Sequence, residues 1–259
     1  MARQRSPEGP PPPPPVQKLR IRYARRGRLR YSSSRDFARA LERALRRAGV
    51  PMAFSAGFHP HPKISYAGAA PTGTASEAEY FEISVTDRVD PHRVRQALDE
   101  ALPDGLDIIE VVEAGPGSLA ERLQASDWEL IFRVEDAGAV AGALERFLAA
   151  EEAPVSRMFK SGEKTFDARA AVIAARLEQD PAGVGGEEND SGCAILRMVV
   201  QHTTPVVRPD DILTALRSVG ELESAVSPQS VTRRAQGPLH TAPAGVADPL
   251  AADKEAVGS

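Results

Sequence analysis

The stretch RDFARALERALRRAGVPMAFSAGFHPHPK, residues 35–63, joins an arginine-rich segment to a compact loop (residues 55–63) that holds one Gly, two Pro and two His. In its first half, apolar residues recur at helical spacing and share one side: Phe37, Leu41, Ala44, Leu45 and Ala48. The opposite side carries Arg35, Arg39, Arg43 and Arg46, with Glu42 among them. This pattern predicts an amphipathic helix that begins at the serines of positions 32–34 and stops at Gly49 and Pro51.

The loop that follows is expected to be stiff although it has little regular structure. Gly57 permits backbone conformations that other residues avoid, whereas Pro60 and Pro62 fix φ. Prolines also bias the residues before them toward extended geometry, in which residues two apart point to the same side. We therefore predict that His59, His61 and Lys63 form one row.

Charge is divided unevenly along the chain. Residues 17–63 hold thirteen Lys and Arg against two acidic residues, a balance of +11, whereas residues 64–259 have a balance of −16. The net charge of −4 hides this asymmetry, which favours a polyanionic partner. Docking of the basic segment on the chain's own acidic half, or on an acidic partner protein, stays open as an alternative.

Length and composition bound the class of protein. A chain of 259 residues has room for two modest domains. The single cysteine, Cys193, excludes an internal disulfide and any cluster that needs three thiolates from this chain. No apolar run approaches the roughly 18 residues of a membrane span, and no secretory signal is visible at the N-terminus. We expect a cytoplasmic protein that contacts no membrane.

Hydrophobic periodicity predicts an α+β protein made of two ferredoxin-like α/β sandwich subdomains with disordered termini. In the first, residues 17–115, the expected order is β-α-β-β-α-β, with strands at 18–23, 64–67, 78–85 and 106–112. The second, residues 126–235, is expected to be a variant copy in which residues 180–192 form a flexible acidic loop. Residues 1–16, which are rich in Pro, and residues 236–259 are expected to be disordered tails.

Several segments, in their order along the chain, resemble one family: residues 28–32 (RLRYS), 35–48 and 51–65, followed by Gly73, Ser76, Glu77, Glu79 and Tyr80. This is the uncharacterised radical-SAM-associated family, a domain of unknown function. The likeness covers about residues 17–235 and is strongest over 28–80. In many bacteria the family is similar to the C-terminal part of a large radical SAM protein, and elsewhere it stands alone. The resemblance implies a stand-alone companion of a separate radical SAM protein.

Two departures qualify that resemblance. The family usually has His where Ser34 stands, while Asp36 two residues later is retained, so no chemistry is carried over to position 34. A radical SAM enzyme also needs three cysteines on one iron–sulfur cluster, and this chain has one. The chain is therefore not itself a radical SAM enzyme.

Our main hypothesis is a non-catalytic RNA-binding or substrate-presenting accessory of that radical SAM protein, with neither cofactor nor metal. Guanidiniums held at helical spacing suit phosphate oxygens, and imidazoles can hydrogen bond to RNA or stack on its bases. The predicted ligand- or RNA-binding residues are Arg28, Arg30, Arg35, Arg39, Arg43, Arg46, Ser55, Gly57, His59, His61 and Lys63.

Two other functions stay open. Asp36, His59 and His61 could form the centre of a metal-dependent enzyme or nuclease, although two histidines without a nearby Cys or a well-placed third ligand make a weak metal signal. The basic face could instead serve a protein–protein scaffold. No glycine-rich phosphate-binding fingerprint follows a predicted strand.

Overall fold

The computed structural model describes residues 12–180 and 192–257, which form an α+β fold as expected. The chain divides into two compact units. Unit 1 comprises Met1–Gly73, Glu77–Ala120 and Leu250–Ser259, and unit 2 comprises Thr74–Ser76 and Glu121–Pro249. Within the described ranges, no helix is both long and apolar enough to cross a membrane.

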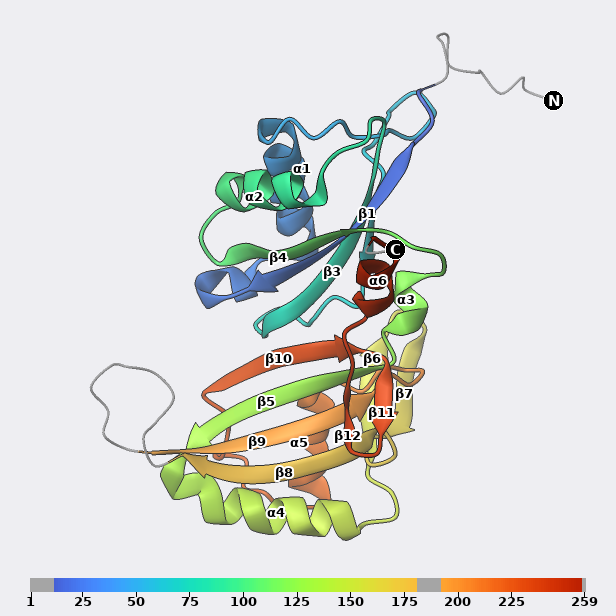
Figure 1. The fold of residues 1–259 in the computed structure, drawn as a ribbon. Coiled ribbons are helices and arrows are strands. Elements are labelled where there is room, and N and C mark those ends of the chain that lie inside the picture. The colour runs from blue at the N-terminus through green and yellow to red at the C-terminus, as the bar shows by residue number, and fades with distance from the viewer. Residues whose placement is uncertain (1–11, 181–191, 258–259) are drawn as a thin grey trace, which may run out of the picture. The chain divides into compact units, whose positions relative to one another are not determined.

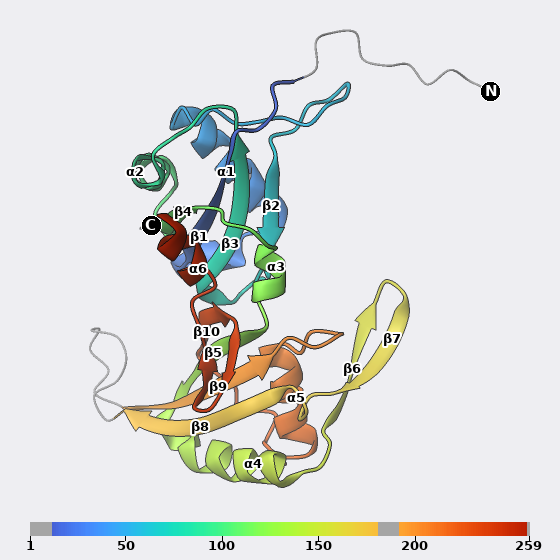
Figure 2. The same cartoon turned by 45° about the vertical axis from the view of Figure 1, so that its right-hand side comes forward.

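Unit 1 is built on a sheet in the order β4-β1-β3-β2 (Figures 1 and 2). Its strands are β1 (Gln17–Arg25), β2 (Ile64–Ala67), β3 (Ala75–Val85) and β4 (Leu106–Glu113). Its helices are the 3-10 helix η1 (Gly27–Tyr31), α1 (Ser34–Arg47), α2 (Pro91–Ala101) and α6 (Ala251–Val257). The short helix α3 (Leu119–Arg122) contains the boundary between the two units, which falls between Ala120 and Glu121.

The two sheet faces of unit 1 are covered by different helices. Leu19 and Ile21 of β1 are fully buried in one apolar cluster with Leu41 of α1 and Leu98 of α2. Because strand side chains alternate, Arg20 points to the opposite face, where its guanidinium meets Asp253 of α6. On that face Arg20 is covered and is only 1% exposed.

Unit 2 has a four-stranded antiparallel sheet in the order β10-β5-β9-β8. These strands are β5 (Ala125–Arg133), β8 (Val172–Asp180), β9 (Cys193–Gln201) and β10 (Ser230–Gly237), and its main helices are α4 (Ala137–Ala149) and α5 (Pro209–Ser218). The 3-10 helix η2 (Val134–Asp136) precedes α4. Two hairpins complete the unit: β6 (Pro154–Phe159) with β7 (Gly162–Asp167), seen in Figure 2, and β11 (Leu239–Thr241) with β12 (Ala244–Val246).

Strand β3 starts within unit 2, since Ala75 and Ser76 pair in parallel with Thr232 and Arg233 of β10. Through this pairing, eight strands are connected by hydrogen bonds in one mixed sheet. The expected α+β class is confirmed, and the ferredoxin-like duplication stays a prediction.

The predicted disorder of residues 236–259 is wrong for the described part of that segment. It holds β11, β12 and α6, and both Leu250 and Asp253 are 0% exposed. A segment rich in Pro, Ala and Gly has too few large apolar side chains to form a core of its own. Here a few of its residues are instead buried against parts of the protein that lie much earlier in the sequence. Residues 1–11 and 181–191, most of the predicted tail and acidic loop, lie outside the described residues.

Candidate nucleic-acid interface

Helix α1 begins at a serine cap, as predicted. Ser33 is the N-cap residue, and its Oγ accepts a hydrogen bond from the Asp36 backbone N–H at 3.2 Å. The Ser33 hydroxyl in turn donates to the Asp36 carboxylate at 2.7 Å, which holds the pKa of Asp36 below its usual value. Asp36 therefore serves the start of the helix.

The two faces of α1 are those predicted from residue spacing. Phe37, Leu41, Ala44 and Leu45 are buried, whereas the arginines are exposed. None of the four predicted arginines has a carboxylate of a described residue within 4.0 Å: Arg35, Arg39, Arg43 and Arg46. This face therefore presents exposed guanidiniums that form no ion pair with a carboxylate of a described residue.

Helix α1 ends in a hydrogen-bonded reversal of the chain. The Gly49 N–H donates to the Arg46 carbonyl at 3.2 Å, and the Val50 N–H donates to the Leu45 carbonyl at 3.1 Å. Gly49 has φ of +65°, a left-handed conformation that glycine adopts at little cost. This turn ends α1 before the chain continues to the loop at residues 55–63.

The arginines of η1 differ from one another in their surroundings. Arg28 is exposed and makes no ion pair with a described residue, whereas Arg30 donates to the Tyr31 hydroxyl at 2.9 Å and lies over that ring. Arg26, just before η1, is bound by Glu77 and by Asp107. Arg26 is thus unavailable to a ligand, while Arg28 is available.

Two hydrogen bonds close the loop at residues 55–61. The Ser55 N–H donates to the His61 carbonyl at 2.8 Å, and the His61 N–H donates to the Ser55 hydroxyl at 3.0 Å. Gly57 lies between them with φ of +130°. His59, His61 and Lys63 are all exposed, so Ser55 and Gly57 shape the loop while the three basic side chains face solvent.

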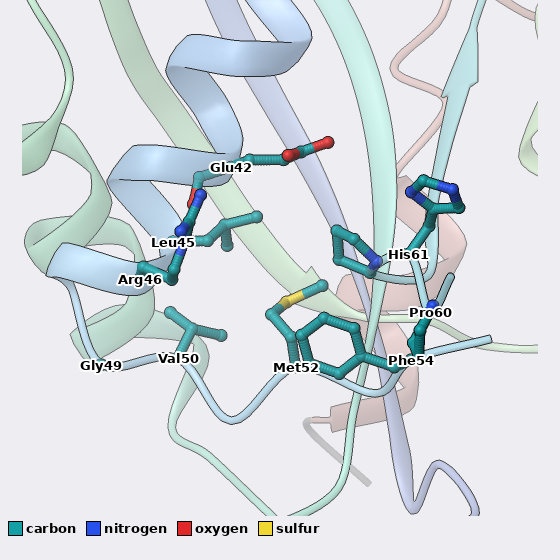
Figure 3. Close-up of a pocket in the computed structure, with 10 residues that line it drawn as sticks. Glu42, Leu45, Arg46, Gly49, Val50, Met52, Phe54, Pro60 and His61 are labelled. Carbon is teal, nitrogen blue, oxygen red and sulfur yellow. The ribbon is translucent and has the colours of Figure 1, made fainter. Parts of the chain in front are cut away.

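A pocket of about 570 Å³ lies between the C-terminal half of α1 and this loop (Figure 3). Most of the residues that line it are apolar, and three are charged or polar: Glu42, Arg46 and His61. In Figure 3, Glu42 extends from α1 toward the side on which His61 lies. The remaining lining residues are Leu45, Gly49, Val50, Met52, Phe54, Pro60 and Pro62.

The structure joins some of the predicted residues and leaves others apart. Arg46 and His61 share the pocket, whereas Asp36 caps the other end of α1 and, in the described part of the chain, forms no hydrogen bond or ion pair with His59 or His61. Over the described ranges, no three His, Cys, Asp or Glu side chains are grouped so that they could hold a metal ion. The geometry gives the binding hypothesis more support than the Asp36–His59–His61 centre.

Comparison with known proteins identifies a family to which no activity is assigned. Residues 18–209 match the family described as "Uncharacterized protein conserved in bacteria (DUF2344)". The chain belongs to this family. No curated protein matches it. Among solved structures, the chain is similar to "Crystal Structure of an Unknown Protein from Galdieria sulphuraria", with 16% identity over 82% of this chain and 98% of that chain. The TM-score of 0.24 is too low to support an argument about fold or function.

The DUF2344 chain also exposes aromatic side chains that are not among the predicted site residues. Tyr31, Phe54 and Phe58 are 61%, 41% and 62% exposed, and all three stand in the basic stretch of sequence between residues 17 and 63. Their position within the motif segments was the available signal, but periodicity assigns an aromatic residue to the core by default. Exposed aromatic rings beside cations are typical of surfaces on which bases stack.

Tyr66 of β2 borders the same region. Its ring packs against Phe37 at 5.9 Å between centroids, and it remains 44% exposed. Burial of the hydroxyl end, with a smaller contribution from the negative charge of Glu42, raises the pKa of Tyr66 to about 12. The phenol is therefore a hydrogen-bond donor at neutral pH.

Proposed function

We propose that this DUF2344 protein binds single-stranded RNA through unit 1, as a non-catalytic accessory that presents RNA or another substrate to a separate radical SAM protein in the cytoplasm. The observation that carries the RNA-binding part is the exposed arginine face of α1, whose guanidiniums have no carboxylate oxygen of a described residue within 4.0 Å. Anionic ligands are the natural complement of such a face.

The spacing of the arginines suits a phosphate backbone. Arg35, Arg39 and Arg43 follow one another at about 6 Å along the helix axis, given a rise of ~1.5 Å per residue. Each guanidinium offers a planar set of donors to phosphate oxygens, and the buried apolar face of α1 fixes where the set lies. Binding of this kind releases counterions and does not depend on sequence.

The exposed aromatic residues add the second component of single-strand binding. Phe54 and Phe58 flank Ser55 and Gly57 in the closed loop, and Tyr31 lies at the end of η1. Bases of any sequence can stack on such rings because every base has a π-face. A duplex keeps its bases stacked inside, so this combination favours a single strand.

The first test compares two double charge reversals in the full chain. Arg39→Glu with Arg43→Glu should weaken binding of a fluorescent oligouridine about tenfold or more and lower the slope of log affinity against log salt by about two. The control is Arg88→Glu with Arg93→Glu, which changes charge equally at side chains that are 75% and 87% exposed near the start of α2.

Fluorescence anisotropy at several salt concentrations measures both quantities. Equal affinities for the two double variants would show that overall charge, and not the α1 face, determines binding. Unchanged affinity of the α1 variant at low salt would overturn the proposed function.

The link to a radical SAM protein is supported by the resemblance of residues 28–80 and by the lack of cysteines for a cluster of the chain's own. Affinity purification from cells, with and without nuclease, tests it. We expect a radical SAM protein in the eluate, and RNA that crosslinks to unit 1. Recovery of acidic proteins alone, insensitive to nuclease, would favour the scaffold hypothesis.

We also propose that each unit is a ferredoxin-like sandwich. The supporting observation is the strand order: numbered along each unit, the four strands lie as 4-1-3-2 in β4-β1-β3-β2 and again in β10-β5-β9-β8. In both units a helix follows the first strand and another follows the third. The hairpin β6–β7 is the insertion that makes the second unit a variant.

A further inference from the structure

We propose that the pocket at the C-terminal end of α1 is a subsite for one guanine base of the bound strand. The inference rests on the proposed RNA binding and names the base that the site selects. It is carried by the Glu42 carboxylate, which lines an otherwise largely apolar pocket.

The size and lining of the pocket fit a planar ring. Its volume of about 570 Å³ lies within the range of small-molecule sites. Leu45, Val50 and Met52 provide apolar contact, and the half-exposed ring of Phe54 offers a stacking surface. Figure 3 shows Met52 and Phe54 side by side, below Glu42. A phosphate or a sugar would gain little from these walls, whereas a base would bury its faces.

Glu42 determines which base fits best. Its carboxylate forms no ion pair with a described residue, so both oxygens can accept hydrogen bonds from a ligand. Guanine places two donors side by side on its Watson–Crick edge, the N1–H and the N2 amino group. Adenine, cytosine and uracil each place an acceptor next to their donor, and that acceptor would face a negatively charged oxygen.

Arg46 and His61 connect the pocket to the phosphate-binding face. The Arg46 Nε donates to the Glu42 carbonyl at 3.4 Å, which keeps the guanidinium at the rim beside the base and in line with Arg43 on the same helix face. His61 lines the other side of the pocket, on a backbone closed by Ser55. A strand can thus place a base in the pocket while its phosphates remain on the arginines.

The experiment uses oligouridine 10-mers whose central position is uridine, guanosine, inosine or adenosine. Inosine keeps the N1–H of guanine and lacks its amino group. For the full chain, we expect guanosine to bind roughly fivefold or more tightly than the other three. Glu42→Gln should remove most of this preference and leave oligouridine affinity the same or slightly higher. Glu145→Gln, the same charge change on α4 in unit 2, should leave both unchanged.

The possible results separate this inference from the function on which it rests. Equal affinity for all four 10-mers, with binding still lost in Arg39→Glu/Arg43→Glu, overturns the guanine subsite and leaves RNA binding intact. A guanosine preference that survives Glu42→Gln also overturns the subsite. Affinity that is insensitive to salt and to the arginine variants overturns RNA binding itself.

Discussion

Arg20 lies at a position that alternation along β1 assigns to a polar strand face, yet its side chain is in the interior of unit 1. Its guanidinium donates to Glu82 at 2.9 Å, to Asp253 at 2.7 Å and to the Gly117 carbonyl at 2.5 Å. A buried ion pair contributes little net stability when complete, but removing one partner leaves an uncompensated charge.

We therefore predict that Asp253→Ala lowers the free energy of unfolding of unit 1 by about 3–5 kcal/mol. Lys254→Ala is the control: Lys254 pairs with Glu110 at 2.7 Å, but its side chain is 39% exposed, so its loss should cost at most about 1 kcal/mol. Urea denaturation followed by tyrosine fluorescence measures this, because Tyr23, Tyr31, Tyr66 and Tyr80 all lie in unit 1. Equal costs for the two variants would contradict it.

His202 is a partly buried titratable side chain in unit 2, as Arg20 is a buried charged side chain in unit 1. Its ring contacts the Ser126 hydroxyl at 2.8 Å and the Leu123 carbonyl at 2.7 Å, and burial lowers its pKa below the usual value. The unfolded state then binds the proton more readily than the folded state. The stability that neutral His202 provides is complete above the unfolded pKa of about 6.5 and is lost as pH falls below it.

We expect unit 2 to lose stability between pH 7.5 and pH 5.5, and His202→Gln to lose less over the same interval although it is less stable at pH 7.5. Trp128, the single tryptophan, lies buried in β5 and reports the unfolding of unit 2 by its fluorescence. Parallel pH curves for the two proteins would exclude His202 as the titrating group.

Among the elements, α1 was predictable from sequence and the pocket beside it was not. Helical spacing alone places Phe37 and Leu41 inward and the arginines outward, because these faces depend on neighbours three or four residues away. The pocket depends on where Met52, Phe54 and Pro60 return against α1, which is a tertiary arrangement. In the sequence, Glu42 is therefore only a single acidic residue on a basic helix face. Its position beside the apolar residues of the pocket is what suggests a role in binding.

The end of α1 gives a test at the same scale. Gly49 has φ of +65° and an added Cβ would meet nothing within 4 Å, so Gly49→Ala should cost only the backbone penalty of about 1–2 kcal/mol. Gly138→Ala in α4 also meets nothing but has an ordinary φ, and should be neutral or stabilise by up to about 1 kcal/mol. Urea midpoints measure both. Stabilisation by Gly49→Ala would show that the turn is not held in the left-handed conformation.

For the molecule as a whole, the charge count predicted a basic region but overstated how many of its cationic side chains are available to a ligand. Of the +11 in residues 17–63, Arg20 and Arg26 are engaged with carboxylates within unit 1, and Lys18 pairs with Glu82. The arginines of α1 are not so engaged. Which cations are used internally depends on residues far away in sequence, and no local pattern reports them.

The C-terminal segment was mispredicted for the same reason. Residues 236–259 are poor in large apolar side chains, as their composition shows. Composition could not indicate that Leu250 and Asp253 are buried in unit 1. The order of strands and helices within each unit could, in contrast, be predicted from sequence, because apolar residues recur with a period of two in strands and of about 3.6 in helices.

The separation of 233 residues between Arg20 and Asp253 has a consequence for how the protein is made. A ribosome working at ~5–20 residues per second needs roughly 12–47 s to reach Asp253 after it has added Arg20. Throughout that interval, the Arg20 guanidinium can pair with Glu82 but not yet with Asp253, and all of unit 2 is synthesised before Asp253. The ion pairs of Arg20 in unit 1 are therefore complete only after the whole of unit 2 has been synthesised, although the synthesis of unit 1 starts earlier.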